Sequence, residues 1–218
     1  MFISYQEFEE NLSRVQASIL AAEQKSGRLA GSVRLLPVTK NHPVDAALYA
    51  FRSGLKSVGE NRVQEALSKM DDADSAMGWE LIGPLQSNKA KKVAECFDRV
   101  QSVDRAKVAK ALQRYASEAE RNLGVLLQIN AGADPNKSGA SLEEASALME
   151  CALGQSNLKI DGLMTIAPLD DDPAVARACF AALRKCRDRL EASFGVILPE
   201  LSMGMSGDME AAIQEGST

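Results

Sequence analysis

The chain has 218 residues, 45% of them hydrophobic and 25% charged, which is typical of a soluble globular protein with a full core. Its 30 acidic and 25 basic residues give a formal net charge of -5, which argues against nucleic acid or an anionic membrane as the main partner. The N-terminal residues do not resemble a signal peptide, and no apolar run approaches the roughly 20 residues that span a bilayer. We therefore expect a cytoplasmic protein. One histidine and four cysteines without a CxxC pair predict neither a metal site nor a disulfide framework.

Helices and strands alternate along the whole chain. Apolar residues recur at helical spacing from Phe8 to Ile19 and predict an amphipathic helix that ends near Gly27. The apolar segment 33–38 predicts a first strand, and a helix follows from Pro43 to Gly54. The same pattern predicts strands at 55–58, 79–82, 99–103, 123–129, 159–164 and 198–202, with helices between them starting near 61, 88, 104, 141, 173 and 206.

This alternation predicts a parallel sheet with its helices outside, either an open doubly wound sheet or a closed (β/α)8 barrel. The nearest glycine cluster, Gly204 with Gly207, lies at the wrong end of the chain for a dinucleotide-binding fingerprint. We therefore expect a single (β/α)8 TIM-type barrel with an extra N-terminal helix. Seven strands are predicted, and Thr218 stands where an eighth would be due. We expect residues 1–218 to form one domain without its C-terminal strand and tail.

In such a barrel, functional groups gather where strands end. Lys40 ends the first predicted strand, where a lysine is costly to bury unless its ammonium is paired, deprotonated or converted to an imine. Lys40 is therefore a candidate for a Schiff base. From position alone, a lysine that simply reaches solvent is the simpler interpretation. Lys89 and Lys137 are likewise most simply interpreted as surface lysines, and His42 as a lone surface histidine.

The loop from Ser202 to Ser206 combines hydroxyl groups, the flexible backbone of Gly204 and the start of a predicted helix. These features suit a phosphate, which such barrels bind near their last strands. An ordinary helix cap at Ser206 is the alternative. Asp208, in the first turn of the predicted helix, favours the cap because it already occupies the positive end of the helix dipole.

Seven stretches, in order along nearly the whole chain, resemble one family. They are LLPVTK (35–40), VGENRVQE (58–65), WELIGPLQSNK (79–89), QSVD (101–104), LLQINAGADPNKSG (126–139), GLMTIAP (162–168) and LSMGMSGDMEAAIQEGST (201–218). Together they resemble the pyridoxal phosphate homeostasis proteins, also called the YggS or PROSC family. A single stretch would be weak evidence, but seven in register are highly specific.

The resemblance implies a barrel like the N-terminal domain of alanine racemase, with pyridoxal 5'-phosphate held as a Schiff base on Lys40. It implies that Asn61 lies beside the cofactor and that Ser202, Met203 and Gly204 lie near the phosphate. Family members bind and deliver pyridoxal phosphate and maintain vitamin B6 balance, without established catalysis. The resemblance thus implies a monomer with recipient apo-enzymes as partners.

The sequence departs from the family pattern at three places. The family usually has histidine at Glu80 and aspartate at Gly207. After Gly-Ser-Thr the family continues into a strand containing Val-Arg-Ile-Gly, whose arginine and glycine approach the cofactor. We therefore expect either a shortened sequence or a weakened site.

Two other functions compete with a noncatalytic carrier. One is a pyridoxal phosphate enzyme of the racemase or decarboxylase type acting on a small amino acid, and the other is an aldolase that uses Lys40 without a cofactor. The resembling racemases need a second domain, for which 218 residues leave no room. Tyr5, Tyr49 and Tyr115 lie in predicted helices, so no second acid/base group stands out. These points favour the carrier.

Overall fold

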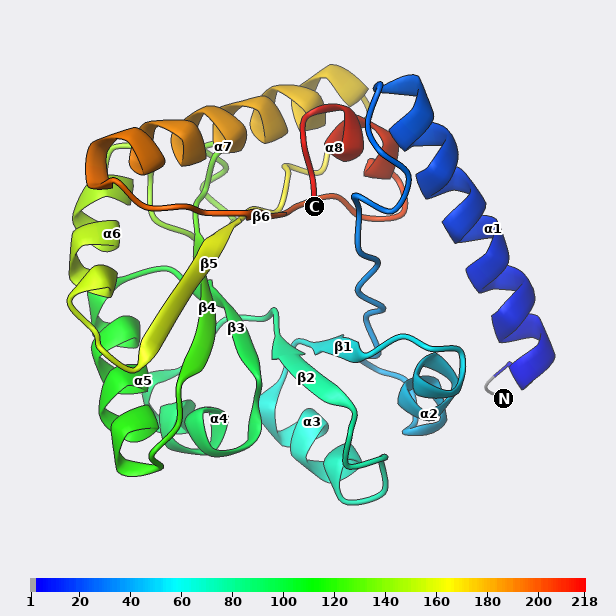
Figure 1. Ribbon diagram of the computed structural model, residues 1–218, viewed down its shortest axis with the longest axis horizontal. Helices are drawn as coiled ribbons and strands as arrows, with labels where there is room; N and C mark the ends of the chain where they lie inside the picture. The colour runs from blue at the N-terminus through cyan, green and yellow to red at the C-terminus, as the bar shows by residue number, and fades with distance from the viewer. Residues whose placement is uncertain (1–2) are drawn as a thin grey trace.

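The computed structural model describes residues 3–218 and shows a curled parallel sheet with helices on its outside (Figure 1). Within these residues six strands pair in chain order, β1-β2-β3-β4-β5-β6. The strands are β1 (Ser57–Glu60), β2 (Gly78–Leu81), β3 (Arg99–Val103), β4 (Leu123–Gln128), β5 (Leu158–Met164) and β6 (Glu200–Ser202). The helices are α1 (Tyr5–Lys25), α2 (Asp45–Arg52), α3 (Val63–Met70), η1 (Ser87–Lys89), α4 (Ala90–Cys96), α5 (Ala106–Glu118), α6 (Ala145–Leu153), α7 (Pro173–Phe194) and α8 (Met209–Gln214). The predicted α/β architecture is confirmed.

The first predicted strand, 33–38, forms only an isolated parallel bridge between Val38 and Gly59. The Gly59 amide donates to the Pro37 carbonyl at 2.8 Å, and the Thr39 amide donates to the Gly59 carbonyl at 3.1 Å. Pro37 has no amide hydrogen, which limits pairing along this segment. The segment nevertheless runs beside β1 in the place of a first barrel strand.

The two edges of the sheet approach each other at Thr218. Its amide donates to the Leu201 carbonyl of β6 at 3.1 Å, and its carbonyl accepts a 2.7 Å hydrogen bond from the Arg34 amide. Figure 1 shows the C-terminus in the middle of the molecule next to β6. Thr218 therefore joins β6 to the first segment, in the position that an eighth strand takes in a closed barrel.

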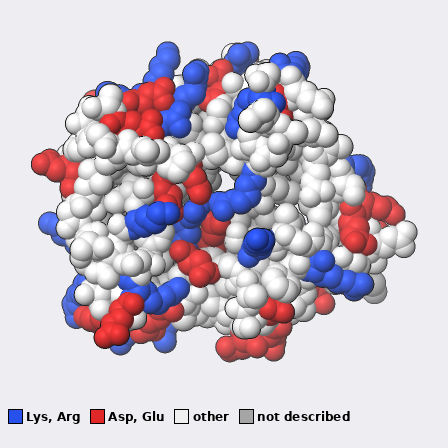
Figure 2. Space-filling model, viewed as in Figure 1, with Lys and Arg blue, Asp and Glu red and all other residues white. Residues whose placement is uncertain are grey.

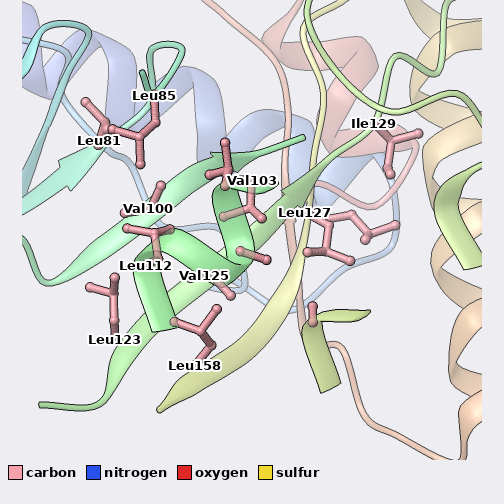
Figure 3. Close-up of a cluster of buried hydrophobic side chains, with 14 of the residues drawn as sticks. Leu81, Leu85, Val100, Val103, Leu112, Leu123, Val125, Leu127, Ile129 and Leu158 are labelled. Carbon is pink, nitrogen blue, oxygen red and sulfur yellow. The ribbon is translucent and has the colours of Figure 1, made fainter. Parts of the chain in front are cut away.

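The core lies between the sheet and the surrounding helices (Figure 3). Leu112 of α5 lies beside Val100 of β3 and Val125 of β4, and all three are fully buried. Burying a side chain of this size contributes about 2 kcal/mol relative to leaving it exposed. This layer fixes the strand ends that carry the candidate site.

The N-terminal helix α1 packs against the C-terminal part of the chain. Ile19 and Ala22 form a small apolar cluster with Ile213 of α8. The Arg28 guanidinium donates to the carbonyls of Ile213 at 3.0 Å and Ser217 at 2.6 Å. The extra N-terminal helix expected from the sequence thus covers the region where the two edges of the sheet meet.

Cys179 and Cys186 lie on α7, and both are buried and free. Burial raises the pKa of both thiols, so they remain protonated at neutral pH. Across residues 3–218, no helix is at once long and apolar enough to cross a membrane.

Candidate functional site

Lys40 follows the bridge between Val38 and Gly59, at the end of the first segment. The preceding residue, Thr39, is buried, and its hydroxyl donates to Oε1 of Glu60 in β1 at 2.7 Å. Lys40 itself lies in the turn that follows this segment. Lys40 is exposed, and its ammonium makes no hydrogen bond or ion pair with any residue of 3–218.

The backbone on both sides of Lys40 is held by a second lysine. Lys69 of α3 is 6% exposed, and its ammonium donates to the Thr39 carbonyl at 2.8 Å, to Glu60 Oε1 at 2.7 Å and to Glu65 Oε1 at 3.0 Å. These contacts use all three of its protons. Glu65 also accepts a hydrogen bond from the amide of Asn41, which has a φ of 62°.

This arrangement fixes the peptide groups before and after Lys40 while leaving its amine unpaired. Burial acts to raise the pKa of the Glu65 carboxyl, but the bonds from Lys69 and Asn41 outweigh it and lower the pKa below its usual value. Glu65 therefore remains a charged acceptor at neutral pH. Sequence reasoning missed Lys69, because a lysine in an amphipathic helix is normally a solvated surface residue.

Asn61 lies directly after β1, at the neighbouring strand end. It is half-buried, and its side-chain amide makes no hydrogen bond within the part of the chain that the structure describes. The loop after β2 passes close to it, because a Cβ placed on Gly83 would lie 2.2 Å from the Asn61 carbonyl oxygen. Glycine is required at 83 for this approach.

Ser202 ends β6 and takes part in a line of hydrogen bonds across the inside of the barrel. Its hydroxyl donates to Gln101 Oε1 at 2.6 Å, and Gln101 Nε2 donates to Glu80 Oε2 at 2.7 Å. The three side chains come from β6, β3 and β2. Gln101 was not predicted as a functional residue, although a glutamine inside an apolar strand was the available signal.

The loop after Ser202 folds tightly against α8. Met203 is buried, and Gly204 has a φ of 94° that favours glycine. A Cβ on Gly204 would lie 2.5 Å from the Ala212 side chain. The Asp208 carboxylate accepts a hydrogen bond from the Met205 amide, so that amide is already bonded within the loop.

A group of charged side chains lies inside the barrel beside Glu80. Arg99 is 3.1 Å from Asp161, forms a short ion pair with Glu200 and lies 4.0 Å from Glu80. Arg34 lies 3.3 Å from Glu200 and 3.7 Å from Glu80. Figure 2 shows acidic and basic side chains gathered around a hollow near the middle of the face in view.

Burial opposes the charge on Arg99, but its hydrogen bond to Glu200 and the charges of Glu80, Glu200 and Asp161 outweigh it and raise the pKa of the guanidinium. The inside of this barrel is therefore not a purely apolar core. Nothing in the sequence indicated that these charged residues would be neighbours in the folded chain.

The remaining sequence candidates are Lys89, Lys137 and His42. Lys89 is half-buried in η1, and Lys137 is half-buried in the loop after β4, where the Asn130 side chain binds the Asp134 carbonyl. No hydrogen bond or ion pair within 3–218 joins either lysine to Lys40. His42 is exposed in the turn before α2.

Comparison with known proteins identifies the family. A sequence profile described as alanine racemase, N-terminal domain, matches residues 3–217. The pyridoxal phosphate homeostasis protein of Pseudomonas aeruginosa is 42% identical over 210 residues, which cover 96% of this chain and 90% of that protein. This chain belongs to the pyridoxal phosphate homeostasis protein family. The resemblance drawn from the seven sequence stretches is confirmed.

Solved structures confirm the barrel fold of the family. A structure described as an unknown protein from Bifidobacterium adolescentis has a TM-score of 0.93 and 37% identity, and the match covers 100% of this chain and 94% of that one. PipY of Synechococcus elongatus, solved with pyridoxal phosphate bound, has a TM-score of 0.79 and 38% identity, with coverage of 93% and 95%. The alanine-racemase-like α/β barrel predicted from the sequence is thus the fold of the family.

Proposed function

We propose that this chain binds pyridoxal 5'-phosphate as a Schiff base on Lys40 and acts in intracellular vitamin B6 homeostasis as a noncatalytic carrier. The observation that carries the proposal is the amine of Lys40, which has no partner in residues 3–218 and lies at the end of the first segment between two peptide groups that Lys69 and Glu65 hold in place. An amine held in this way is suited to condense with an aldehyde, which is the group that the cofactor supplies.

The groups around Lys40 fit the rest of the cofactor. Asn61, at the end of the neighbouring strand, has a half-buried amide without a partner in residues 3–218 and suits a polar group of the ring. The loop that contains Ser202, Met203 and Gly204 suits the phosphate, because barrels of this type bind phosphates in the loops after their last strands. PipY, a relative of similar length, was solved with this cofactor.

The absence of catalysis is supported by the positions of the acid/base candidates. Tyr5 lies in α1, Tyr49 in α2 and Tyr115 in α5, so none follows a strand of the barrel. A site exposed to solvent favours exchange of the cofactor over controlled carbanion chemistry. The names of the curated relatives refer to homeostasis and not to a reaction.

We further propose that residues 1–218 act as one barrel domain, as a cytoplasmic monomer that passes the cofactor to recipient apo-enzymes. The net charge of -5 supports a freely diffusing protein. Light scattering of the purified protein tests the monomer, since a mass twice that of the chain would contradict it. Transfer is tested by mixing loaded protein with an apo-enzyme and following the recovery of its activity.

The central experiment combines absorbance with chemical trapping. Protein loaded with pyridoxal phosphate is reduced with borohydride, digested and mapped, and the label is expected on Lys40. Lys40→Ala is expected to lose the absorbance band of the Schiff base, whereas the matched lysine variants Lys89→Ala and Lys137→Ala are expected to keep it. Label on another lysine of the unchanged chain would refute the assignment. Steady exchange of an amino-acid α-proton in heavy water, abolished by Lys40→Ala, would instead favour an enzyme.

A further inference from the structure

Three polar side chains cross the inside of the barrel in one continuous line. Glu80 is 3% exposed and Gln101 is 2% exposed, while Ser202 is half-buried at the end of β6. Gln101 Nε2 lies 2.7 Å from Glu80 Oε2, and Ser202 Oγ lies 2.6 Å from Gln101 Oε1. Both distances are those of strong hydrogen bonds, and the middle residue has no access to water.

The chemistry of Glu80 fixes the direction of this line. An ionised carboxylate only accepts hydrogen bonds, so the NH₂ group of Gln101 must face it. The other end of the same amide, its carbonyl oxygen, then faces Ser202 and also only accepts. The Ser202 hydroxyl must therefore be the donor, and its single proton is used on Gln101.

The groups around Glu80 support its role as an acceptor. The Arg34 guanidinium lies 3.7 Å from Glu80 Oε1, and the Arg99 guanidinium lies 4.0 Å from Glu80 Oε2. The Ser57 hydroxyl donates to Oε1 at 3.0 Å. Every group that faces the Glu80 carboxylate in this arrangement carries donor protons, so the carboxylate acts as the acceptor.

We propose that Glu80, acting through Gln101, determines the hydrogen-bonding role of Ser202 toward the ligand. The Ser202 hydroxyl oxygen can then accept hydrogen bonds from the ligand but cannot donate one. This inference rests on the proposed function, because it concerns the phosphate end of the same site. Glu80 and Gln101 are positioning residues. Ser202 cannot donate to an ionised phosphate oxygen unless it leaves Gln101 Oε1 unpaired in the barrel interior, which carries a desolvation penalty. The phosphate must then depend on donors other than this hydroxyl.

Glu80→Gln provides the decisive change because it keeps the size of the side chain and adds a donor. The new amide can donate to Gln101 Oε1, Gln101 can turn its NH₂ group toward Ser202, and the Ser202 proton becomes available to the ligand. Arg99 keeps its ion pairs with Glu200 and Asp161, and Arg34 keeps its own with Glu200. The neighbouring charges therefore remain paired in the variant.

The test measures dissociation constants of pyridoxal phosphate by absorbance for four chains: unchanged, Ser202→Ala, Glu80→Gln and the double variant. In the unchanged background, Ser202→Ala is expected to weaken binding by less than about threefold, and in the Glu80→Gln background by about tenfold or more. Pyridoxal, which lacks the phosphate, is expected to show no such difference. Equal effects of Ser202→Ala in both backgrounds, or a tenfold loss in the unchanged background, would overturn the inference.

Glu200→Gln is the matched control. It makes the same chemical change inside the barrel, on the strand of Ser202, but Glu200 does not contact Gln101. The effect of Ser202→Ala is expected to stay small in the Glu200→Gln background. If Glu200→Gln enlarged that effect as much as Glu80→Gln, the loss of a charge and not the direction of the hydrogen bonds would be responsible.

A measurement on the ligand-free protein separates this inference from the proposed function. Nuclear Overhauser effects should join the Gln101 side-chain amide protons to Glu80 in the unchanged chain and to Ser202 in Glu80→Gln. Amide protons that face Ser202 in the unchanged chain would refute the inference whether or not the cofactor binds. Failure of Lys40 to be labelled would refute the proposed function alone.

Discussion

Lys40 and Lys69 show how much one residue's environment can be read from sequence. Lys40 was found because it ends an apolar segment, a pattern visible along the chain. The role of Lys69 was not visible, because its partners Thr39 and Glu60 come from other elements and meet it only in the folded chain. Sequence patterns show where a strand ends, but they do not show which buried charges become neighbours.

Replacing Lys69 with methionine is expected to destabilise the protein by about 3 kcal/mol, because Glu60 would remain as a buried charge without its cation. Urea unfolding followed by circular dichroism measures this loss. Lys40→Met is the control, since the exposed Lys40 ammonium has no partner in residues 3–218, and it should change the free energy of unfolding by less than about 0.5 kcal/mol. Similar losses in both variants would contradict the role of Lys69.

Gly162 illustrates a steric requirement at a single residue. A Cβ at this position would lie 1.9 Å from the Glu200 carbonyl oxygen on the neighbouring strand. Gly162→Ala is therefore expected to cost about 3 kcal/mol of unfolding free energy, because the backbone of β5 or β6 must move. Gly207→Ala, with nothing within 4 Å of its Cβ, should be within about 0.5 kcal/mol of the unchanged chain in the same urea titration. A small loss of unfolding free energy in Gly162→Ala would show that β5 and β6 can separate without much cost.

Among the elements, long periodic segments were predicted well and short ones less well. The prediction of β3 at 99–103 agrees with the structure at both ends, and α7 begins at the predicted residue 173. The last helix begins at Met209 and not at Ser206, because Asp208 binds the Met205 amide and holds the intervening residues in a turn. Short elements are decided by such local contacts, which periodicity does not encode.

Helix α8 is linked to α7 by Glu215, whose carboxylate pairs with Arg177 at 2.9 Å and with Arg184 at 2.8 Å. The hydrogen bond from Arg177 lowers the pKa of this carboxyl below its usual 4.5, against the effect of burial and with the help of Arg184. Because the folded-state pKa is lowered, the stabilisation is complete above about pH 4.5 and is lost as the pH falls through the folded-state value.

Glu215→Gln is accordingly expected to cost about 2 kcal/mol at pH 7 and progressively less below about pH 4. Urea unfolding at several pH values measures the difference between the variant and the unchanged chain. Glu118→Gln, which removes an exposed ion pair with Arg114, should cost about 0.5 kcal/mol or less. If the difference in unfolding free energy between Glu215→Gln and the unchanged chain stayed constant as the pH falls, the charge of Glu215 would not be the source of the stability.

At the scale of the whole molecule, the predicted barrel and the N-terminal helix are both present, but their closure was not foreseen. The sequence predicted a barrel without its C-terminal strand and gave no sign that Thr218 connects Leu201 to Arg34 by backbone hydrogen bonds. Arg28 adds a second connection between the two ends of the chain. Contacts between residues so far apart leave no periodic signal, so the sequence could not predict them.

Arg28→Ala is expected to reduce the free energy of unfolding by about 2 kcal/mol, because the Ile213 and Ser217 carbonyls lose a charged donor. Hydrogen exchange should accelerate at the Thr218 and Arg34 amides more than at the amides of β4. Arg14→Ala, which removes an exposed arginine from the same N-terminal region, should leave these rates unchanged. Unaltered exchange at Thr218 in Arg28→Ala would show that the two edges meet without its help.

The chain-order pairing of the strands has a consequence for synthesis on the ribosome. Each strand from β2 to β6 pairs with the strand made just before it, so the sheet can grow while the chain is still emerging. The bonds of Arg28 to Ile213 and Ser217 span 185 and 189 residues, and the entropy of closing such loops makes them late events. Phe8 of α1 can pack early against Tyr49 of α2, but Ile19 and Ala22 stay uncovered until Ile213 has left the exit tunnel.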